Sequence, residues 1–295
     1  MRKEVCEFQL IGGLGNQLFI MMAATQHLRD GYPTKINTFN LGSYGDSHGS
    51  SIEGIVFPFK TPEFKETETD LSAFKFRLIS LLRRKANFKN IANWQIENEH
   101  GFSDSSHAKN LEGRKHLGYF QSPKMFDSSL KPLLFDITPK IPSDKFIHYS
   151  REAEETKPIF LHIRRGDYLT YKDTFGVLSM DYYEKALNVL RQEGLPLNEL
   201  WIISSDEAIG SELGMKLGVN FRVISADSKL SDIETLILMK YGSAHIIANS
   251  TYSWWGAFIS KNTKRVVAPS PWFKNAIIPK SLIPENWVEI ESLWI

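Results

Sequence analysis

The chain has 295 residues and a formal net charge of +1, which gives no electrostatic reason to expect a nucleic acid or an anionic membrane as a partner. Hydrophobic residues make up 42% of the sequence, enough for the core of one large α/β domain or two ordinary ones, but no stretch is long enough to span a bilayer. The single cysteine, Cys6, excludes a disulfide framework within the chain and a metal site built from several cysteines, and it is typical of a reducing compartment.

The first thirty residues predict a strand, a glycine turn and a helix. The apolar strand is expected over 5–11, the tight turn GGLG at 12–15, and a helix with apolar residues at helical spacing over 16–30. Two glutamates interrupt the first apolar run, so the segment does not resemble a signal peptide and a cytoplasmic location is expected. The glycines do not form the dinucleotide fingerprint, because Leu18 stands where its last glycine is required.

The middle of the chain carries fewer signals. A short strand is expected at 34–39, and the alternation of apolar and basic residues over 71–88 predicts an amphipathic helix. A solvated basic face is the favoured interpretation of that helix, and contact with a membrane or an acidic partner is the alternative. A charged stretch at 150–157 indicates a linker or helix end, so we expect domains at 1–152 and 153–295, with the C-terminal tail free to pack back on the first.

After that stretch, strands and helices alternate regularly. Alternation at these lengths indicates βαβ units and a parallel sheet covered by helices on both faces, so the second half is predicted to be a Rossmann-like domain. The expected strands are 158–164, 200–206, 221–224, 244–250 and 264–269, and the expected helices are 180–192, 207–218, 232–242 and 251–261.

Ligands of open parallel sheets bind beyond the carboxyl ends of the strands. The strongest signal at such an end is HIRRGD at 162–167. Strand alternation sends His162 and Arg164 to one face of the sheet, and the glycine that follows lets the chain turn. Guanidinium groups match phosphate oxygens, so the arginine pair predicts a diphosphate site, with Asp167 orienting one arginine or accepting from a ligand hydroxyl. A solvated surface turn is the weaker alternative, because the motif begins in an apolar strand.

The other strand ends each have two interpretations. The glycine loop before Asn16 presents backbone N–H groups to an anion or a sugar, or it is a structural turn. Hydroxyls at 250–253 bind phosphate or cap the next helix, and Asp206 binds a nucleoside or caps its own helix. The adjacent tryptophans at 254–255 are predicted to pack in the core rather than to stack on a ligand.

The four strand-end motifs together resemble glycosyltransferase family 11, and in particular its short bacterial members, the α-1,2-fucosyltransferases. No metalloprotease, serine-hydrolase or Walker motif competes with this interpretation. The stretches that carry the resemblance are GGLGNQLF at 12–19, HIRRGDYL at 162–169, SSDEA at 204–208 and NSTYSWWGAFIS at 249–260. Their order and spacing match the family, while 40–110 carries no motif.

The resemblance implies an α/β fold of the GT-B-like type, with two facing Rossmann-like domains and parallel sheets. The first domain is then expected to bind the acceptor and the second to bind the donor, GDP-β-L-fucose. The implied reaction is inverting transfer of L-fucose to the 2-hydroxyl of a terminal β-galactoside in a bacterial O-antigen or capsule. Lipid-linked acceptors would place the enzyme at the inner face of the plasma membrane.

The resemblance also implies roles for single residues. Arg164 is expected to clamp the leaving diphosphate. The candidates for the catalytic base are Asp167, His162 and a residue of the N-terminal domain. The implied donor-binding residues are Gly13, Gly15, Asn16, Arg165, Asp206, Asn249, Ser250, Thr251 and Ser253.

Metal-independent catalysis is expected, since no D-x-D motif is evident and an arginine with a helix N-terminus can stabilise the leaving group. No cofactor is expected beyond the donor substrate. The alternatives are a transferase with a different nucleotide sugar or linkage, and an inactive module that binds a glycan or a nucleotide.

Overall fold

The computed structural model describes residues 4–39, 41, 52–66, 115–276 and 281–295, and the backbone alone at 90–91 and 94–96. Contacts divide the chain into two compact units: Met1–Asp136 with Pro279–Pro284, and Ile137–Ile278 with Glu285–Ile295. The boundary predicted between residues 152 and 153 lies too late in the chain, because helix α4 (Asp144–Thr156) continues across that position.

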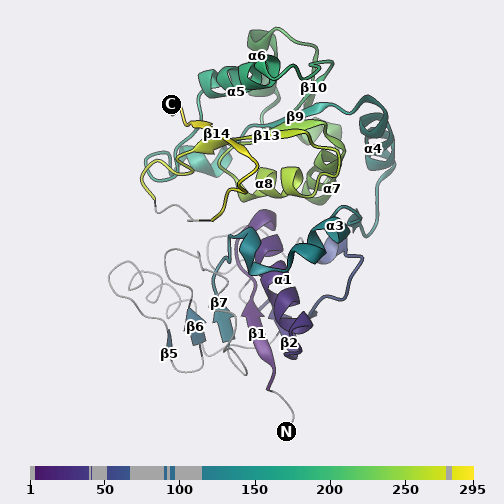
Figure 1. Ribbon diagram of the computed structural model, residues 1–295, viewed down its shortest axis with the longest axis vertical. Coiled ribbons are helices and arrows are strands. Elements are labelled where there is room, and N and C mark those ends of the chain that lie inside the picture. The colour runs from purple at the N-terminus through teal and green to yellow at the C-terminus, as the bar shows by residue number, and fades with distance from the viewer. Residues whose placement is uncertain are drawn as a thin grey trace. The chain divides into compact units, whose positions relative to one another are not determined.

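The first unit is built on a sheet with strand order β4-β2-β1-β7-β6-β5, in which the antiparallel pairing of β5 with β6 departs from an otherwise parallel arrangement (Figure 1). All four residues of the central strand β1 are buried, and helix α1 follows it directly. The elements of this unit are β1 Cys6–Gln9, α1 Leu14–Arg29, β2 Thr34–Asn37, η1 Ile52–Gly54, β3 Ile55–Val56, β4 Glu63–Lys65, β5 Asn90–Ile91, β6 Trp94–Ile96, β7 Lys115–Leu117, η4 Pro123–Met125, η5 Ser128–Leu130 and α3 Lys131–Leu134.

Helix α1 begins two residues earlier than the sequence predicts. Gly12 has φ +76°, a conformation that favours glycine, and Gly13 is the N-cap, so Gly15 already lies in the first helical turn. The side chain of Gln17 fixes this start, because its Nε2 donates to the Gly12 carbonyl at 2.9 Å. The turn between strand and helix is therefore shorter than the four glycine-rich residues indicate.

The second unit is built on a parallel sheet with strand order β11-β10-β9-β12-β13-β14. Chain order is 3-2-1-4-5-6 across the sheet, which is the Rossmann arrangement. The elements of this unit are β8 Thr138–Pro139, α4, β9 Ile159–His162, η6 Gly166–Leu169, α5 Met180–Gln192, β10 Leu200–Ile203, α6 Glu207–Leu217, β11 Phe221–Ile224, η7 Ala226–Ser228, α7 Asp232–Leu238, η8 Met239–Tyr241, β12 Ala244–Ile246, α8 Thr251–Phe258, β13 Arg265–Ser270 and β14 Val288–Glu291.

These two units with parallel sheets confirm the predicted α/β fold of the GT-B-like class. In the second unit every predicted strand and helix is present, with ends shifted by a few residues. Strand β14 was not predicted, because its four residues are few and it pairs with β13 only through the C-terminal tail.

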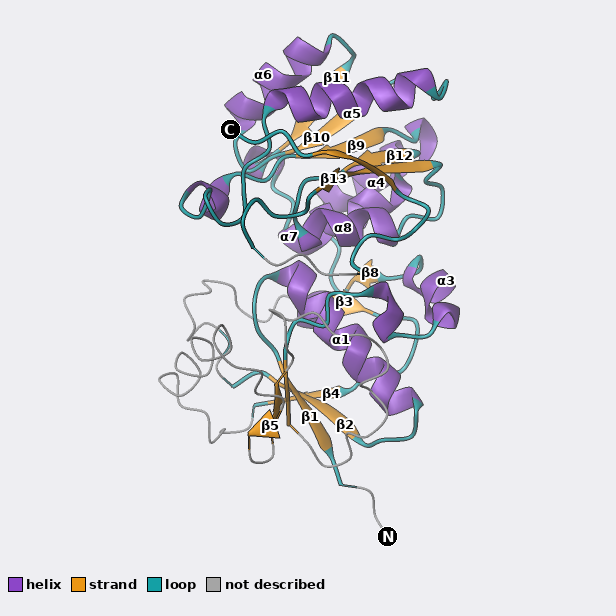
Figure 2. Ribbon diagram, turned by 60° about the vertical axis from the view of Figure 1, so that its left-hand side comes forward, coloured by secondary structure: helices purple, strands orange, loops and turns teal. Residues whose placement is uncertain are grey.

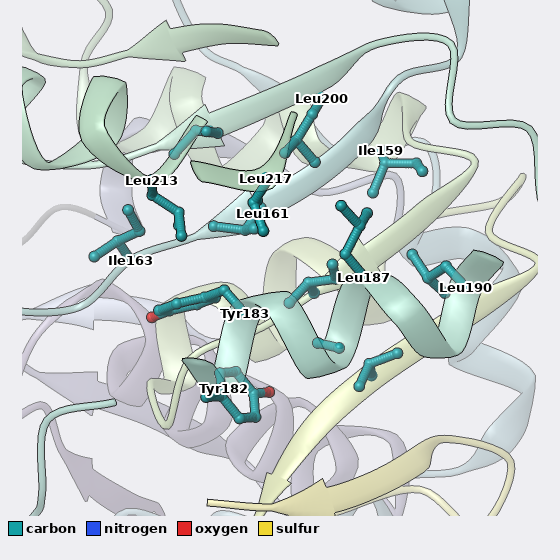
Figure 3. Packing of buried hydrophobic residues seen from close by; sticks show 14 of the residues in the cluster. Ile159, Leu161, Ile163, Tyr182, Tyr183, Leu187, Leu190, Leu200, Leu213 and Leu217 are labelled. Carbon is teal, nitrogen blue, oxygen red and sulfur yellow. The ribbon is translucent and has the colours of Figure 1, made fainter. Parts of the chain in front are cut away.

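Helices cover both faces of the second sheet (Figure 2). On one face, Ile159 and Leu161 of β9, together with Ile163 just beyond it, pack against α5 and α6 in a continuous apolar cluster (Figure 3). Burying each such side chain contributes about 1.5 to 3 kcal/mol. On the other face, Phe160 contacts Trp201 and His162 contacts Tyr252 of α8. His162 therefore lies on the face of the sheet that α8 covers.

The predicted core role of the paired tryptophans is confirmed, since the side chains of Trp254 and Trp255 are 0% exposed. The amphipathic helix predicted at 71–88 lies outside the described residues. Among the helices that are described, none combines the length and the apolar character that a transmembrane segment requires.

Candidate functional site

The carboxyl ends of β9 and β12 define the most favourable place for a ligand in the second unit. The two strands are neighbours, with Leu161 paired to Ile246, and they mark the point where the strand order changes direction. After β9 the chain continues to β10 and β11 on one side, and β12 leads to β13 and β14 on the other. A crevice opens at such a topological switch point, so the sheet brings HIRRGD and the segment that follows β12 to one place.

His162 ends β9 and is buried beneath the switch point, on the face covered by α8. The centroid of its ring lies 5.5 Å from the centroid of the Tyr252 ring. Its Nδ1 has no hydrogen-bond partner among the described residues. Burial, assisted by the nearby Arg164 charge, lowers the pKa of the imidazole to about 3. His162 is therefore neutral near pH 7, which makes it a weak base and leaves one ring nitrogen for a hydrogen bond to a ligand or a water molecule.

Arg164 lies on the same face as His162, as the sequence predicts, and one third of its side chain is exposed. Its Nη2 forms an ion pair with Asp167 Oδ1 at 2.6 Å, and its Cζ lies 5.2 Å from the centre of the Tyr168 ring. The buried Nε has no hydrogen-bond partner among the described residues. The guanidinium is thus held by two neighbours, and the exposed third of the side chain stays accessible to a ligand.

The charge of Arg165 acts on Tyr183 of α5, whereas the charge of Arg164 acts on Tyr252 of α8. Burial raises the pKa of the Tyr183 hydroxyl on α5, and the Arg165 charge opposes that shift. Burial also raises the pKa of the Tyr252 hydroxyl on α8, and there the charge of Arg164 opposes the shift. Only the first arginine of the pair therefore accompanies His162, which makes Arg164 the stronger candidate for a diphosphate ligand.

Asn249, predicted as a donor-binding residue, fixes the loop that follows η6. Its side chain is 0% exposed, and Nδ2 donates to the carbonyls of Phe175 at 2.9 Å and Gly176 at 3.3 Å. The backbone carbonyl of Asn249 accepts from the Tyr168 hydroxyl at 3.0 Å. Sequence reasoning missed this connection and the role of Tyr168, although an aromatic residue directly after RRGD is a visible signal for a cation–π contact.

The hydroxyls after β12 lie at the start of α8. Ser250 is the N-cap of this helix, but its side chain makes no capping hydrogen bond. Ser253 is 0% exposed and donates to the carbonyls of Ala248 and Ser250 at 3.3 and 3.1 Å, which identifies it as a structural residue rather than a free ligand group. Thr251 is partly buried in the first turn. Ser250 and Thr251 thus remain the candidates for phosphate contacts at this helix end.

Asp206 has the structural role that the sequence left open. Its Oδ1 accepts from the N–H of Ile209 at 3.2 Å, so the carboxylate caps α6. Ser204 supports the same turn, because its hydroxyl accepts from the Asp206 N–H at 3.1 Å. These contacts account for both residues without a nucleoside.

The glycine loop of the first unit lies at the switch point of its own sheet, between β1 and β7. Asn16 Oδ1 accepts from Nε2 of Gln121, which follows β7, at 2.7 Å. A Cβ on Gly12 would lie 2.8 Å from Asn16 Nδ2 and 3.0 Å from the ring of Tyr119. Close packing therefore explains this glycine, while the predicted donor contacts of Gly13, Gly15 and Asn16 stay predictions.

One cluster of possible metal ligands is present among the described residues. Cys6, His27 and His116 are buried around Phe8, with their ligand atoms within 4.8 Å of one another. Phe8 stacks on His116 with ring centroids 4.4 Å apart and meets His27 edge-on at 5.2 Å, so aromatic packing in the core accounts for both imidazoles.

The sequence profile described as glycosyl transferase family 11 matches residues 61–291. The chain belongs to this family. The description of the family as glycosyl transferases is in keeping with an arginine at the switch point of a Rossmann-like unit.

Two curated relatives come from Escherichia coli. The O-antigen biosynthesis glycosyltransferase WbnK is 34% identical over 184 residues, which are 59% of this chain and 60% of that protein. An α-1,2-colitosyltransferase is 28% identical over 215 residues, 65% of this chain and 69% of that protein. Among solved structures, the family 9 glycosyltransferase from Veillonella parvula is 11% identical with a TM-score of 0.49, over 98% of this chain and 87% of that chain.

Proposed function

We propose that this family 11 enzyme transfers L-fucose from GDP-β-L-fucose to the 2-hydroxyl of a terminal β-galactoside, with inversion to an α-1,2 linkage. The observation that carries the proposal is the position of Arg164 beside neutral His162 at the switch point, where an arginine suits a nucleoside diphosphate. Family membership makes that diphosphate a sugar donor. The fucosyl donor itself is supported by the resemblance of the four motifs.

The arginine supplies the main chemical assistance in this proposal. When the anomeric bond breaks, negative charge collects on the terminal phosphate of the leaving GDP. A guanidinium already fixed at that point stabilises this charge, and the N-terminus of α8 adds positive potential near Ser250 and Thr251. His162 is neutral and adds no charge, so its proposed role is a hydrogen bond to the donor.

The acceptor hydroxyl loses its proton during attack, and Asp167 is the proposed base. In the ligand-free chain its carboxylate is engaged by Arg164 at 2.6 Å. A diphosphate that recruits the guanidinium would release this carboxylate, which then accepts the proton of the attacking hydroxyl. Donor binding and activation of the base are coupled in this scheme.

The proposed chemistry uses no metal ion, because Arg164 takes the role that a divalent cation has at other nucleotide-sugar sites. Activity in the presence of EDTA is the direct test of this part of the proposal.

Colitose is the second candidate for the transferred sugar. One relative is an α-1,2-colitosyltransferase, and colitose is fucose without its 3-hydroxyl group. Competition between GDP-fucose and GDP-colitose at equal concentrations separates the two, because a site that hydrogen-bonds the 3-hydroxyl rejects the deoxy sugar.

The proposed biological setting is the synthesis of a bacterial surface glycan, as the name of the first relative suggests. The acceptor is then a galactose-terminated oligosaccharide, free or lipid-linked, at the cytoplasmic face of the membrane. Lactose, N-acetyllactosamine and galactosyl-β-1,3-N-acetylgalactosamine are suitable first acceptors.

The test measures transfer from GDP-fucose to these acceptors, with EDTA present, by wild type and by Arg164→Ala. We expect product from wild type and a loss of about 10² to 10⁴ in rate for the variant, since one charge-stabilising donor is removed. Arg151→Ala, an exposed arginine on α4, is the control and is expected to retain full activity. A wild-type protein that neither binds GDP-fucose nor fucosylates any acceptor would contradict the proposal.

A further inference from the structure

We propose that Tyr168 is a positioning residue for Arg164, which it holds ready for the diphosphate of the donor. The inference rests on the proposed function, because that function assigns the diphosphate to Arg164. It adds a residue that neither the motif analysis nor the family match assigns.

The ring of Tyr168 contacts the guanidinium, and the carboxylate of Asp167 forms an ion pair with it. The Arg164 Cζ lies 5.2 Å from the centre of the Tyr168 ring, and Asp167 Oδ1 lies 2.6 Å from Nη2. All three residues belong to the five-residue stretch 164–168, which turns sharply at Gly166, where φ is +29°. The turn folds the aromatic ring back under the arginine, so the cation–π contact is a direct result of the local sequence.

Tyr168 is itself fixed at both ends. Its hydroxyl donates to the backbone carbonyl of Asn249 at 3.0 Å, beyond the end of β12, and its ring lies 5.3 Å from that of Phe175. The Asn249 amide closes the connection by donating to the carbonyls of Phe175 and Gly176. A loop after β9 is thereby joined to the strand end beside it by three hydrogen bonds.

This arrangement limits the directions that the Arg164 side chain can take. A free arginine loses rotamer entropy when it binds an anion, whereas one held between an aromatic face and a carboxylate has already lost much of it. The ion pair with Asp167 is exposed on the carboxylate side, where 56% of the Asp167 side chain is accessible, and water weakens it. The Tyr168 contact persists when a diphosphate replaces Asp167, so Tyr168 is the neighbour that acts in the bound state.

The experiment measures dissociation constants for GDP, ADP and UDP by calorimetry in Tyr168→Phe and Tyr168→Leu. Phenylalanine keeps the aromatic face and loses the hydrogen bond to Asn249, so we expect a loss of about fivefold in GDP affinity. Leucine also loses the aromatic face, and we expect a loss of about 20-fold. Tyr171→Phe, which removes a hydroxyl from an exposed tyrosine in the same loop, is the matched control and is expected to change affinity by less than about twofold.

A double-mutant cycle separates positioning from a structural effect. In the Arg164→Gln background, the Tyr168 substitutions are expected to change GDP affinity by less than about twofold, because the group that they position is gone. Equal losses in both backgrounds would overturn the inference, since Tyr168 would then act on the loop as a whole. If Tyr168→Leu does not fold, the cycle with Tyr168→Phe decides in the same way.

The nucleotide panel separates this inference from the proposed function. If wild type prefers ADP or UDP and the cycle still couples Tyr168 to Arg164, the fucosyl assignment is wrong and the role of Tyr168 is retained. GDP binding without coupling would remove the role of Tyr168 alone. Failure of wild type to bind any of the three diphosphates would overturn both.

Discussion

Asp206 is a residue whose structural and functional roles can be separated by substitution. Its carboxylate caps α6 through the N–H of Ile209, and the side chain is exposed at the end of β10. Asparagine caps a helix as well as aspartate does, while alanine does not. We therefore expect Asp206→Asn to keep both stability and activity, and Asp206→Ala to lower the free energy of unfolding by about 1 kcal/mol.

Chemical denaturation and the GDP dissociation constant together check this prediction. A drop in GDP affinity for Asp206→Asn, without a change in stability, would restore the donor-binding role that the sequence suggested.

Residues differ in how far their roles could be predicted from sequence. The pairing of His162 with Arg164 follows from strand alternation alone, because β9 has only two faces. The role of Asn249 could not be predicted, since its amide bonds to the carbonyls of Phe175 and Gly176, more than 70 positions away in the chain. Hydrogen bonds of that span depend on packing that no local pattern encodes.

The central strands β9 and β12 of the second sheet each bury a histidine, and this makes the stability of the unit sensitive to acid. Burial lowers the pKa of His245 to about 4 and that of His162 to about 3. Below pH 6.5 the unfolded chain takes up protons on these rings and the folded chain does not, so the free energy of unfolding falls with pH. Each ring accounts for a loss of about 2 kcal/mol between pH 7 and pH 5.

The substitution His245→Gln isolates the contribution of the β12 histidine to the loss of stability in acid. His245 Nε2 donates to the carbonyl of Met239 at 2.8 Å, and glutamine keeps a donor without titrating. Urea denaturation at pH 7 and pH 5 is expected to show a smaller loss of stability for this variant than for wild type. Met215→Gln, at an exposed position of α6 where neither side chain titrates, serves as the control and should leave the pH dependence unchanged. Equal pH slopes in wild type and His245→Gln would contradict the prediction.

Elements were predictable where their pattern is strong. Helix α5 has the predicted bounds 180–192, since its buried residues recur at helical spacing. The start of α1 was predicted two residues late, because glycines usually signal a turn and here Gly15 lies inside the helix. Strand β14 was missed because its pairing with β13 depends on a tail that returns from another part of the chain.

On the scale of the whole molecule, the second unit is assembled from two separate stretches of sequence. Residues 137–278 carry the HIRRGD motif and the segment that follows β12, and residues 285–295 follow after a segment that belongs to the first unit. The tail supplies strand β14 beside β13 and places Trp287 with its ring centroid 5.5 Å from that of Trp254. Its last residues bond to the backbone near 177–179, close to the carbonyls that Asn249 holds.

A chain that ends at Pro284 is therefore expected to lose the folded second unit, although every motif residue remains. The deletion removes an edge strand of four paired residues and a tryptophan that is only 9% exposed. Loss of one buried tryptophan alone costs about 3 to 5 kcal/mol, against a total stability of about 5 to 15 kcal/mol for a domain. Near-ultraviolet circular dichroism and thermal unfolding of the shortened chain measure the effect, and Glu289→Ala, an exposed residue of β14, is the control. A shortened chain that unfolds cooperatively and binds GDP as wild type does would show that residues 137–278 form the unit by themselves.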